Sequence, residues 1–240
     1  MAKSLTETVT SRLRQDILRC ALPPGARLLT GALCARFDVS LAVVREALSR
    51  LVAEGLVVAE PQRSFRVAPI SVDDLHDLTW LRIEIETLAL RRAIARATLD
   101  WESAVVSALH RLLHTPLYAE GAAPPMNEAP VVNEAWAAAH AAFHLALAAG
   151  CGSPSLLAVR ASLFDRSERY RRLSARAGAE PDRDLEREHR GIAEAALRHE
   201  ADAAAALLAR HLELTAALTL DNLALAAGAT TASVEPITAC

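Results

Sequence analysis

The stretch VSLAVVREALSRLVAEGLV, residues 39–57, decides how the N-terminal part of the chain folds. Its apolar residues recur at helical spacing, Ser40 can cap the first turn, and Gly55 can close the last one. A short helix is expected just before it, over residues 30–37, with the turn DVS between the two. Two short helices joined by a tight turn form a helix-turn-helix, in which the valines and leucines pack inward and hold Arg45 outward.

Two further elements extend this unit to a winged helix-turn-helix over residues 1–70. Upstream, apolar residues recur at every fourth position over residues 5–17, which predicts a helix that the Pro-Pro-Gly of ALPPGARL ends. Downstream, the runs LVVAE (56–60) and SFRVA (64–68) are strand-like and predict a hairpin. The tip of that hairpin carries Arg63, where a wing would meet the DNA backbone or minor groove.

Composition and charge agree with a helical protein that has a small DNA-binding unit. The chain is 52% hydrophobic but only 4% aromatic, which favours helices over a β-sandwich. Residues 1–70 hold ten Lys and Arg against six Asp and Glu, a balance of +4, whereas the rest balances at −7. Chance variation is the alternative explanation. The four cysteines show no CxxC spacing and no signal peptide is evident, so we expect a reduced, cytoplasmic chain. Charged residues interrupt each apolar run, so no membrane span is expected.

The remainder of the chain is typical of a helical bundle over residues 71–227, large enough to enclose a pocket. A loop rich in Pro, Ala and Gly is expected over residues 115–130, and the tail 228–240 lacks periodicity and is expected to be disordered. About six helices are expected, over residues 72–96, 100–114, 133–149, 154–175, 182–198 and 201–227.

Four histidines of the bundle are candidate metal ligands. His140 and His144 are four residues apart, so both rings project from one face of a helix, and His189 and His211 lie on later helices. Neutral imidazole is a common ligand of Zn or Ni, and four such nitrogens would complete a four-coordinate site. The alternative is that they are hydrogen-bonded pocket residues that contact a carboxylate directly.

Three other residues are candidates for binding a small effector. Arg82 can clamp a carboxylate with its two-pronged guanidinium, but it can equally form an i,i+4 pair with Glu86. Arg166 and Tyr170 lie at helical spacing, so one of them can line a pocket, although such a run is more often a solvated face.

The N-terminal segment ILRCALPPGARLLTGALCARFDVSLAVVREALSRLVAEGLVVAEPQRSFRV closely resembles the DNA-binding domain of GntR-type bacterial transcription regulators. The resemblance covers about 60 residues and implies that Arg45 faces a guanine edge, a contact worth about 1–3 kcal/mol of discrimination. It also implies phosphate contacts by Ser40 and Arg63, with Arg50 a weaker candidate. The alternative for Arg45 and Arg50 is a solvated arginine paired with a nearby carboxylate.

The chain departs from that family pattern next to the expected contacts. Leu41 and Ala42 stand where many relatives have Arg and Thr, and Ser64 stands where they have Gly. The operator sequence therefore cannot be carried over, and Leu41 or Ala42 can instead touch a thymine methyl group. The DNA-binding candidates are Ser40, Leu41, Ala42, Arg45, Arg50 and Arg63.

Two later segments, AAAHAAFHLALAAGCGSPSLL and EREHRGIAEAALRHEADAAAALLARHLELT, resemble the FCD ligand-binding domain of the FadR branch of GntR regulators. The resemblance implies that His140, His144, His189 and His211 ring a divalent metal in the bundle core. Most relatives have Asp at the position of His140, so this site has one negative charge fewer. That difference weakens metal binding and favours an anionic effector.

Together these features indicate an effector-responsive transcriptional regulator, most simply a repressor that a small organic acid releases. A winged helix that reads one half-site implies a homodimer on an inverted repeat of double-stranded DNA. One alternative is a metal-dependent hydrolase, because HAAFH has the histidine spacing of HExxH, but Ala141 replaces the required glutamate. An architectural DNA binder is another, but it leaves the helical body unexplained.

Overall fold

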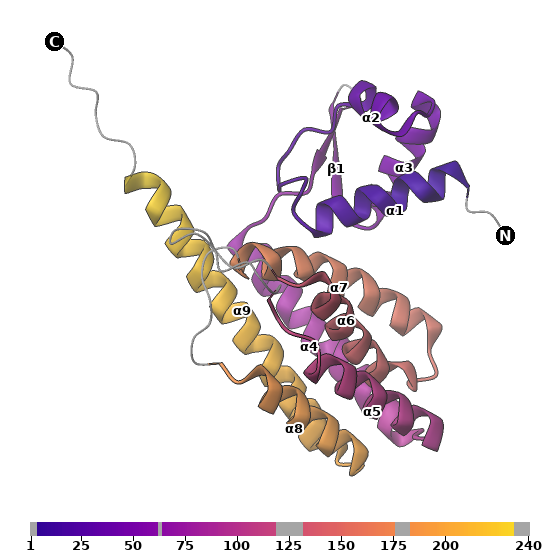
Figure 1. The fold of residues 1–240 in the computed structure, drawn as a ribbon, viewed down its shortest axis with the longest axis vertical. Coiled ribbons are helices and arrows are strands. Elements are labelled where there is room, and N and C mark those ends of the chain that lie inside the picture. Colours follow the sequence, from indigo (N-terminus) through magenta and orange to yellow (C-terminus); the bar gives the residue numbers. More distant parts are fainter. Residues whose placement is uncertain (1–3, 62–63, 119–131, 176–182, 233–240) are drawn as a thin grey trace.

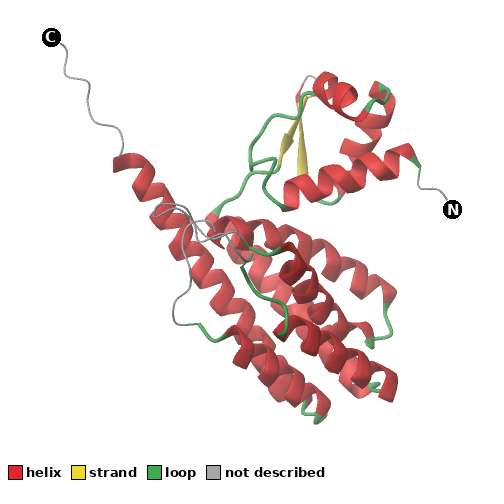
Figure 2. Cartoon of the chain, viewed as in Figure 1, coloured by secondary structure: helices red, strands yellow, loops and turns green. Residues whose placement is uncertain are grey.

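The computed structural model describes residues 4–61, 64–118, 132–175 and 183–232 (Figures 1 and 2). A small N-terminal domain of helices and a hairpin lies beside a larger bundle of helices, which confirms the mainly helical class. The N-terminal elements are α1 (Leu5–Leu18), α2 (Thr30–Phe37), α3 (Leu41–Ala53), β1 (Val57–Glu60) and β2 (Ser64–Val67). They form the expected winged helix-turn-helix.

Helix α3 is the centre of the N-terminal domain. Ser40 caps it by accepting a hydrogen bond from the backbone N–H of Val43 at 3.5 Å, and Asp38 turns the chain before it with a φ of 51°. Gly55 follows its last turn with a φ of 72°, a conformation that costs glycine little. The inward face packs against α1, and the buried side chains are Val9, Leu13, Ile17, Val44, Ala47, Leu48 and Leu51.

The hairpin closes the other side of this core. Its strands are antiparallel, with Val57 opposite Val67 and Glu60 opposite Ser64. Leu28 donates a backbone hydrogen bond of 2.8 Å to Phe65, so the segment after α1 is tied to the wing. The hairpin tip, including Arg63, lies outside the described residues.

The bundle is built around α4, which packs against α6, α7 and α9 (Figure 1). Helix α5 packs against α6 and α8, and α8 packs along α9. Ala89, Ala93, Ala196 and Ala204 are completely buried, and their small side chains let the helices approach closely. The bundle helices are α4 (Val72–Ala95), α5 (Leu99–Leu113), α6 (Glu134–Ala149), α7 (Pro154–Ala175), α8 (Leu185–Leu197) and α9 (Ala201–Ala232).

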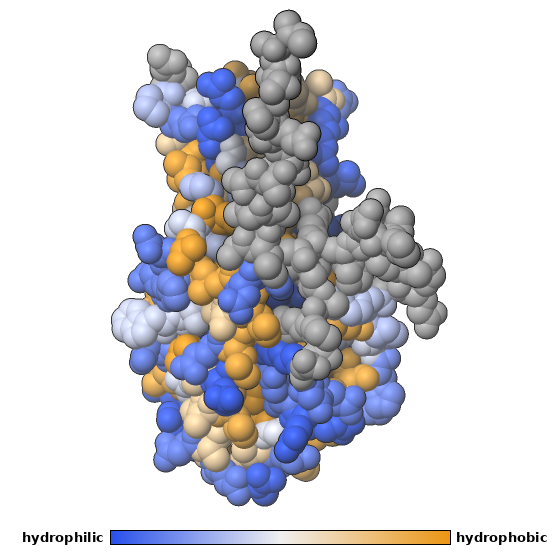
Figure 3. Space-filling view, turned by 90° about the vertical axis from the view of Figure 1, so that its left-hand side faces the viewer, coloured by the Kyte–Doolittle hydropathy of each residue, from blue (hydrophilic) through white to orange (hydrophobic). Residues whose placement is uncertain are grey.

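Helix α9 differs from the sequence prediction in its length and in its apolar character. It runs to Ala232 instead of ending near residue 227, so residues 228–232 of the expected disordered tail are helical, and residues 233–240 lie outside the described residues. Its segment Ala201–Leu223 has a mean hydropathy of 1.3 and is long and apolar enough to cross a membrane, by length and composition only. Hydrophobic side chains also show along the bundle on the face that α9 borders (Figure 3). Because Leu208 and Leu212 are buried against other helices, we interpret α9 as a helix of the bundle core.

The packing of α3 gives a prediction about stability. Leu48→Ala leaves a cavity in the core and should lower the free energy of unfolding of the N-terminal domain by about 2–5 kcal/mol. Leu41→Ala is the matched control on the same helix, because Leu41 is 50% exposed, and its effect should stay within about 0.5 kcal/mol. Urea denaturation followed by circular dichroism measures both, and equal losses would contradict the described packing.

Candidate metal centre, ligand cavity and nucleic-acid interface

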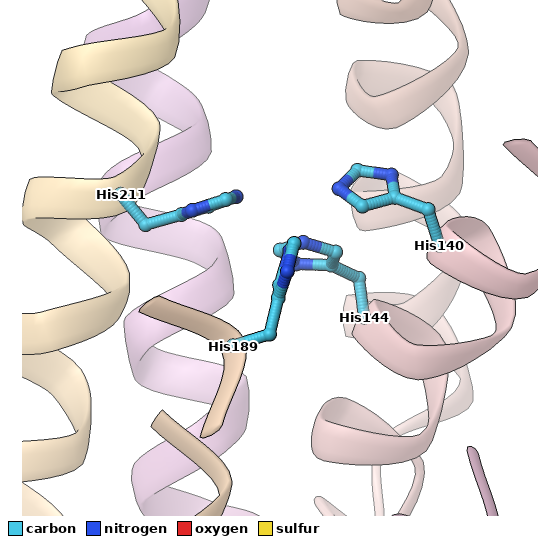
Figure 4. A group of neighbouring side chains, drawn as sticks. All are labelled: His140, His144, His189 and His211. Carbon is cyan, nitrogen blue, oxygen red and sulfur yellow. The ribbon is translucent and has the colours of Figure 1, made fainter. Parts of the chain in front are cut away.

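Four histidines from three helices of the bundle point toward one another (Figure 4). His140 and His144 lie on successive turns of α6, His189 comes from α8, and His211 from α9. Their ring centroids are 4.5–6.2 Å apart, and one nitrogen from each ring lies within 4.8 Å of the others. The structure therefore gathers all four residues that the sequence singled out.

The four imidazoles are buried and uncharged. None is more than 7% exposed, and burial lowers the pKa of every one because it penalises the charged form. The pKa values of His140 and His189 lie well below the usual range, and that of His144 falls to about 4 although Glu86 opposes the shift. At neutral pH each ring therefore has a nitrogen lone pair available to a cation.

The donor set fits a divalent metal ion. Nδ1 of His140, both ring nitrogens of His144 and Nε2 of His189 have no hydrogen-bond partner among the described residues. Buried polar atoms are costly when unpaired, and an ion between the rings would pair with one nitrogen of each ring. In a tetrahedral zinc site with bonds of about 2.0–2.1 Å, the nitrogens would be about 3.3 Å apart, so small rotations of these side chains suffice.

A second layer of side chains orients His211. Its Nδ1 lies 2.7 Å from Oε2 of Glu188, and Arg183 donates two hydrogen bonds of 2.8 Å to the same carboxylate. Burial alone would raise the pKa of Glu188, but hydrogen bonds from Arg183 and His211 lower it to about 2. A carboxylate that fixes Nδ1–H leaves Nε2 free to bind a metal. Sequence reasoning missed both residues, although Glu188 directly precedes His189.

A buried ion network lies on the other side of the cluster. Arg82 donates to Oε1 of Glu86 at 2.6 and 2.8 Å, and Arg160 lies 3.5 Å from Oε2 of the same carboxylate. Burial would raise the pKa of Glu86, but Arg82 holds it well below its usual range. The i,i+4 pair that the sequence allowed is thus formed, and Arg82 also donates to Ser167 at 2.7 Å.

A cavity of about 190 Å³ adjoins the histidines. Arg82 and Tyr170 are among its lining residues, as the sequence suggested, and Arg171, Arg183 and Trp136 add to them. The Trp136 ring stacks on His140 at 4.8 Å, and the guanidinium of Arg171 lies 5.2 Å from the centre of Trp136. Apolar side chains line much of the remainder, including Leu75, Leu117, Val132, Phe164, Leu185 and Leu212.

Of the two candidates on α7, Tyr170 is among the residues that line this cavity and Arg166 is not. Arg166 lies on the side of α7 that faces the N-terminal domain, where its Nη2 donates to Oδ1 of Asp74 at 2.7 Å. The cavity side of α7 instead presents Glu168 and Arg171, which are joined by hydrogen bonds of 2.6 and 2.8 Å. Sequence spacing alone did not show which face of α7 is turned inward.

The first turns of α3 form the candidate nucleic-acid interface. Leu41 and Ala42 are exposed, Ser40 caps the helix, and Arg45 is half-buried and forms no ion pair within the described part of the chain. Arg50 donates to Glu46 at 2.6 Å, so its guanidinium is held on the protein surface. The described part of the wing begins again at Ser64, which leaves Arg63 outside it.

Comparisons with protein families match both parts of the chain. Residues 5–67 match the model described as bacterial regulatory proteins, gntR family, and residues 77–214 match the FCD domain. The chain is 38% identical to the uncharacterized HTH-type transcriptional regulator BphR of Paraburkholderia xenovorans (strain LB400), over 88% of this chain and 83% of that protein. It is 35% identical to the HTH-type transcriptional repressor GlaR of Escherichia coli (strain K12), over 83% and 89%.

Solved structures show the same arrangement of domains. E. coli McbR/YncC superposes with a TM-score of 0.72 over 92% of this chain and 100% of that chain, at 22% identity, which supports the fold alone. A putative GntR transcriptional regulator from Rhodococcus sp. RHA1 superposes with a TM-score of 0.68 at 25% identity, over 91% of this chain and 99% of that chain.

The histidine cluster gives a prediction about metal content. The full chain, purified without chelator or affinity tag, should contain about one divalent metal ion per chain by mass spectrometry. His144→Ala/His189→Ala should lose it because two of the four donors are gone. His110→Ala/His114→Ala is the control, since this exposed pair has the same spacing outside the cluster, and its metal content should match that of the unmodified chain. Metal that persists in the first variant would exclude the cluster as the site.

Proposed function

Because this chain belongs to the GntR family of bacterial regulatory proteins and carries an FCD domain, it is a helix-turn-helix transcriptional regulator, and we propose that a small organic acid bound in its bundle releases it from an operator. The matched families give no support to the metal-dependent hydrolase suggested by HAAFH. Repression is supported by the likeness to a protein named a repressor. We further propose that the protein acts in the cytoplasm, where its operator lies.

We propose that α3 enters the major groove and that Arg45 reads a guanine there. The exposed first turns of α3 support this, since a recognition helix meets base edges with its N-terminal residues. Leu41 and Ala42 are exposed beside Arg45 and can touch thymine methyl groups, while Ser40 and Arg63 would contact phosphates. Arg50 would add a phosphate contact once it leaves Glu46.

The operator would be an inverted repeat read by a homodimer. Each chain provides one winged helix, and two half-sites bound together increase affinity and fix the spacing of the operator. Exposed apolar side chains on α4, Trp80 at 62% and Leu88 at 48%, support a second copy against this helix.

The proposal of an acidic effector rests on the charge of the buried ion network beside the cavity. Arg82 and Arg160 share the single carboxylate of Glu86, so this buried network has one positive charge in excess. The four neighbouring imidazoles are neutral and provide no compensating negative charge. A carboxylate in the cavity would balance this excess and accept hydrogen bonds from guanidinium groups.

A divalent cation held by the four histidines would add positive charge beside the cavity, and it would accept a carboxylate oxygen as a fifth ligand if the site expands from four-coordinate to five-coordinate. The other lining residues would contact the part of the effector that lies beyond its carboxylate. Trp136, Leu185 and Leu212 offer apolar surface, so an acid with an apolar body would bury that body against them. Arg171, which lies over Trp136, would hold the acid's orientation.

The role of Arg45 can be tested on an operator selected from random DNA by the unmodified protein. Arg45→Ala should weaken binding by about 1–3 kcal/mol, roughly five- to 150-fold, and relax sequence preference at one base pair of each half-site. Arg50→Ala should weaken binding to all sequences alike, because a phosphate contact carries no base information. Fluorescence anisotropy measures both, with sedimentation to show that each variant assembles as the unmodified protein does. Unchanged operator affinity of Arg45→Ala would refute the assignment.

The effector class can be tested with pairs of acids and amides. A panel of aliphatic and aromatic carboxylic acids, each beside its primary amide, would be added to the protein–operator complex. At least one acid should weaken operator binding by about five- to 150-fold, and its amide should not, because the amide lacks the charge that the cavity balances. Amides that act as well as their acids would count against an anionic effector.

A further inference from the structure

Tyr170 belongs both to the wall of the cavity and to the joint between the two domains. Its side chain is 2% exposed, lines the cavity, and packs with Leu75, Leu78 and Leu163. Its hydroxyl reaches the linker that joins β2 to α4. A displacement of this ring therefore changes both the cavity and the linker.

Three groups of the linker and of the first turn of α4 surround that hydroxyl. The backbone N–H of Ser71 donates to it at 3.1 Å, it donates to Oδ2 of Asp74 at 2.6 Å, and the Ser71 carbonyl lies 3.3 Å away. Ser71 also caps α4 by accepting from the backbone N–H of Asp74 at 3.0 Å. Burial and the Asp74 acceptor raise the pKa of Tyr170, so the hydroxyl keeps its proton and remains a donor.

Two other residues on the same face of α7 hold the DNA-binding domain itself. Arg166 bonds to Asp74, and its side chain lies against Gly55, where an added Cβ would be 3.4 Å from the Arg166 Cδ. Arg169 is 3% exposed, and its guanidinium donates to the carbonyl of Ala68 at the end of the wing. The backbone carbonyl of Arg169 accepts a weak hydrogen bond from Cys20 Sγ at 3.8 Å. Helix α7 thus touches the chain where α1, α3 and β2 each end.

Besides Tyr170, the residues of α7 that line the cavity lie on its opposite face. Phe164, Ser167, Glu168 and Arg171 are all lining residues, and they alternate along the helix with those that meet the N-terminal domain. A helix moves as a rigid rod over a few turns, so an occupant that shifts its cavity face also shifts the face that holds the linker.

We propose that α7 transmits the state of the cavity to the DNA-binding domain, and that Tyr170 is the positioning residue that joins the cavity wall to the linker through its hydroxyl. This inference rests on the proposed function, because it names how that function is regulated. In the state described, the hydroxyl fixes the linker and the domain is placed to bind an operator. An occupant that displaces the Tyr170 ring breaks the bonds to Ser71 and Asp74 and frees the linker.

The test compares the two tyrosines of the chain in the full-length protein without added ligand. Tyr170→Phe keeps the ring and removes the hydroxyl, whereas Tyr118→Phe removes a hydroxyl from another lining residue of the same cavity. Hydrogen exchange followed by mass spectrometry should show amides of residues 68–75 exchanging about tenfold faster in Tyr170→Phe and unchanged in Tyr118→Phe. Operator affinity should fall about fivefold or more in the first variant alone.

A second variant keeps the proposal testable if the first is unstable. Asp74→Ala removes the acceptor of the same bond from a half-exposed position, and it should speed exchange in the same segment. Each change also breaks a bond of its own, to Ser71 or to Arg166, but both break the bond between Tyr170 and Asp74, so the effect of the double variant should be smaller than the sum of the two single effects. Exchange over residues 68–75 that equals the unmodified protein in Tyr170→Phe, or effects that add in the double variant, would overturn the proposal.

The two proposals fail in different measurements. A chain that binds no selected operator, or that no acid releases, would contradict the proposed function. The exchange rates over residues 68–75 would still decide whether Tyr170 positions the linker.

Discussion

Four imidazole rings share the interior of this bundle, and none of them carries a charge at neutral pH. Burial enforces this here, because the pKa values of His140, His144, His189 and His211 are all lowered. Charged side chains surround the cluster, on the buried Glu86 and the partly buried Glu188 with their arginines. Each of these two carboxylates pairs with at least one guanidinium group and also lies within 4 Å of one histidine nitrogen, that of His144 for Glu86 and that of His211 for Glu188. The cluster, the ion networks and the cavity thus form one electrostatic unit.

The features that could be predicted from sequence are those whose signals are local. Ser40 and Gly55 bracket the recognition helix, and the structure uses both as a cap and a turn. The convergence of the histidines could be expected from the His140–His144 spacing together with the family resemblance. The i,i+4 spacing of Arg82 and Glu86 allowed either a clamp or a pair, and the protein forms the pair within its own core.

Other features depend on tertiary packing and could not be predicted. Arg166 and Arg171 are five residues apart on one helix, which places them about 140° apart around its axis. The pattern of α7 does not indicate which of the two directions faces the cavity, because both faces carry arginine. The packing of α7 against α1 and α4 determines which face points to the cavity, and this face carries Arg171. The extension of α9 to Ala232 likewise could not be predicted, because Gly228, a residue type that often ends helices, lies within its final turns.

The contact between Arg166 and Gly55 has a consequence for how this protein can change over evolution. The winged helix looks like an interchangeable module, yet the glycine that follows its recognition helix lies next to Arg166 of the helical domain, so that a Cβ added there would meet this side chain. A DNA-binding module transplanted from another regulator would fold, but it would meet Arg166, Arg169 and Tyr170 with surfaces that were not selected to fit them. New operator preferences are therefore more easily acquired by substitutions in the first turns of α3 than by exchange of the whole module.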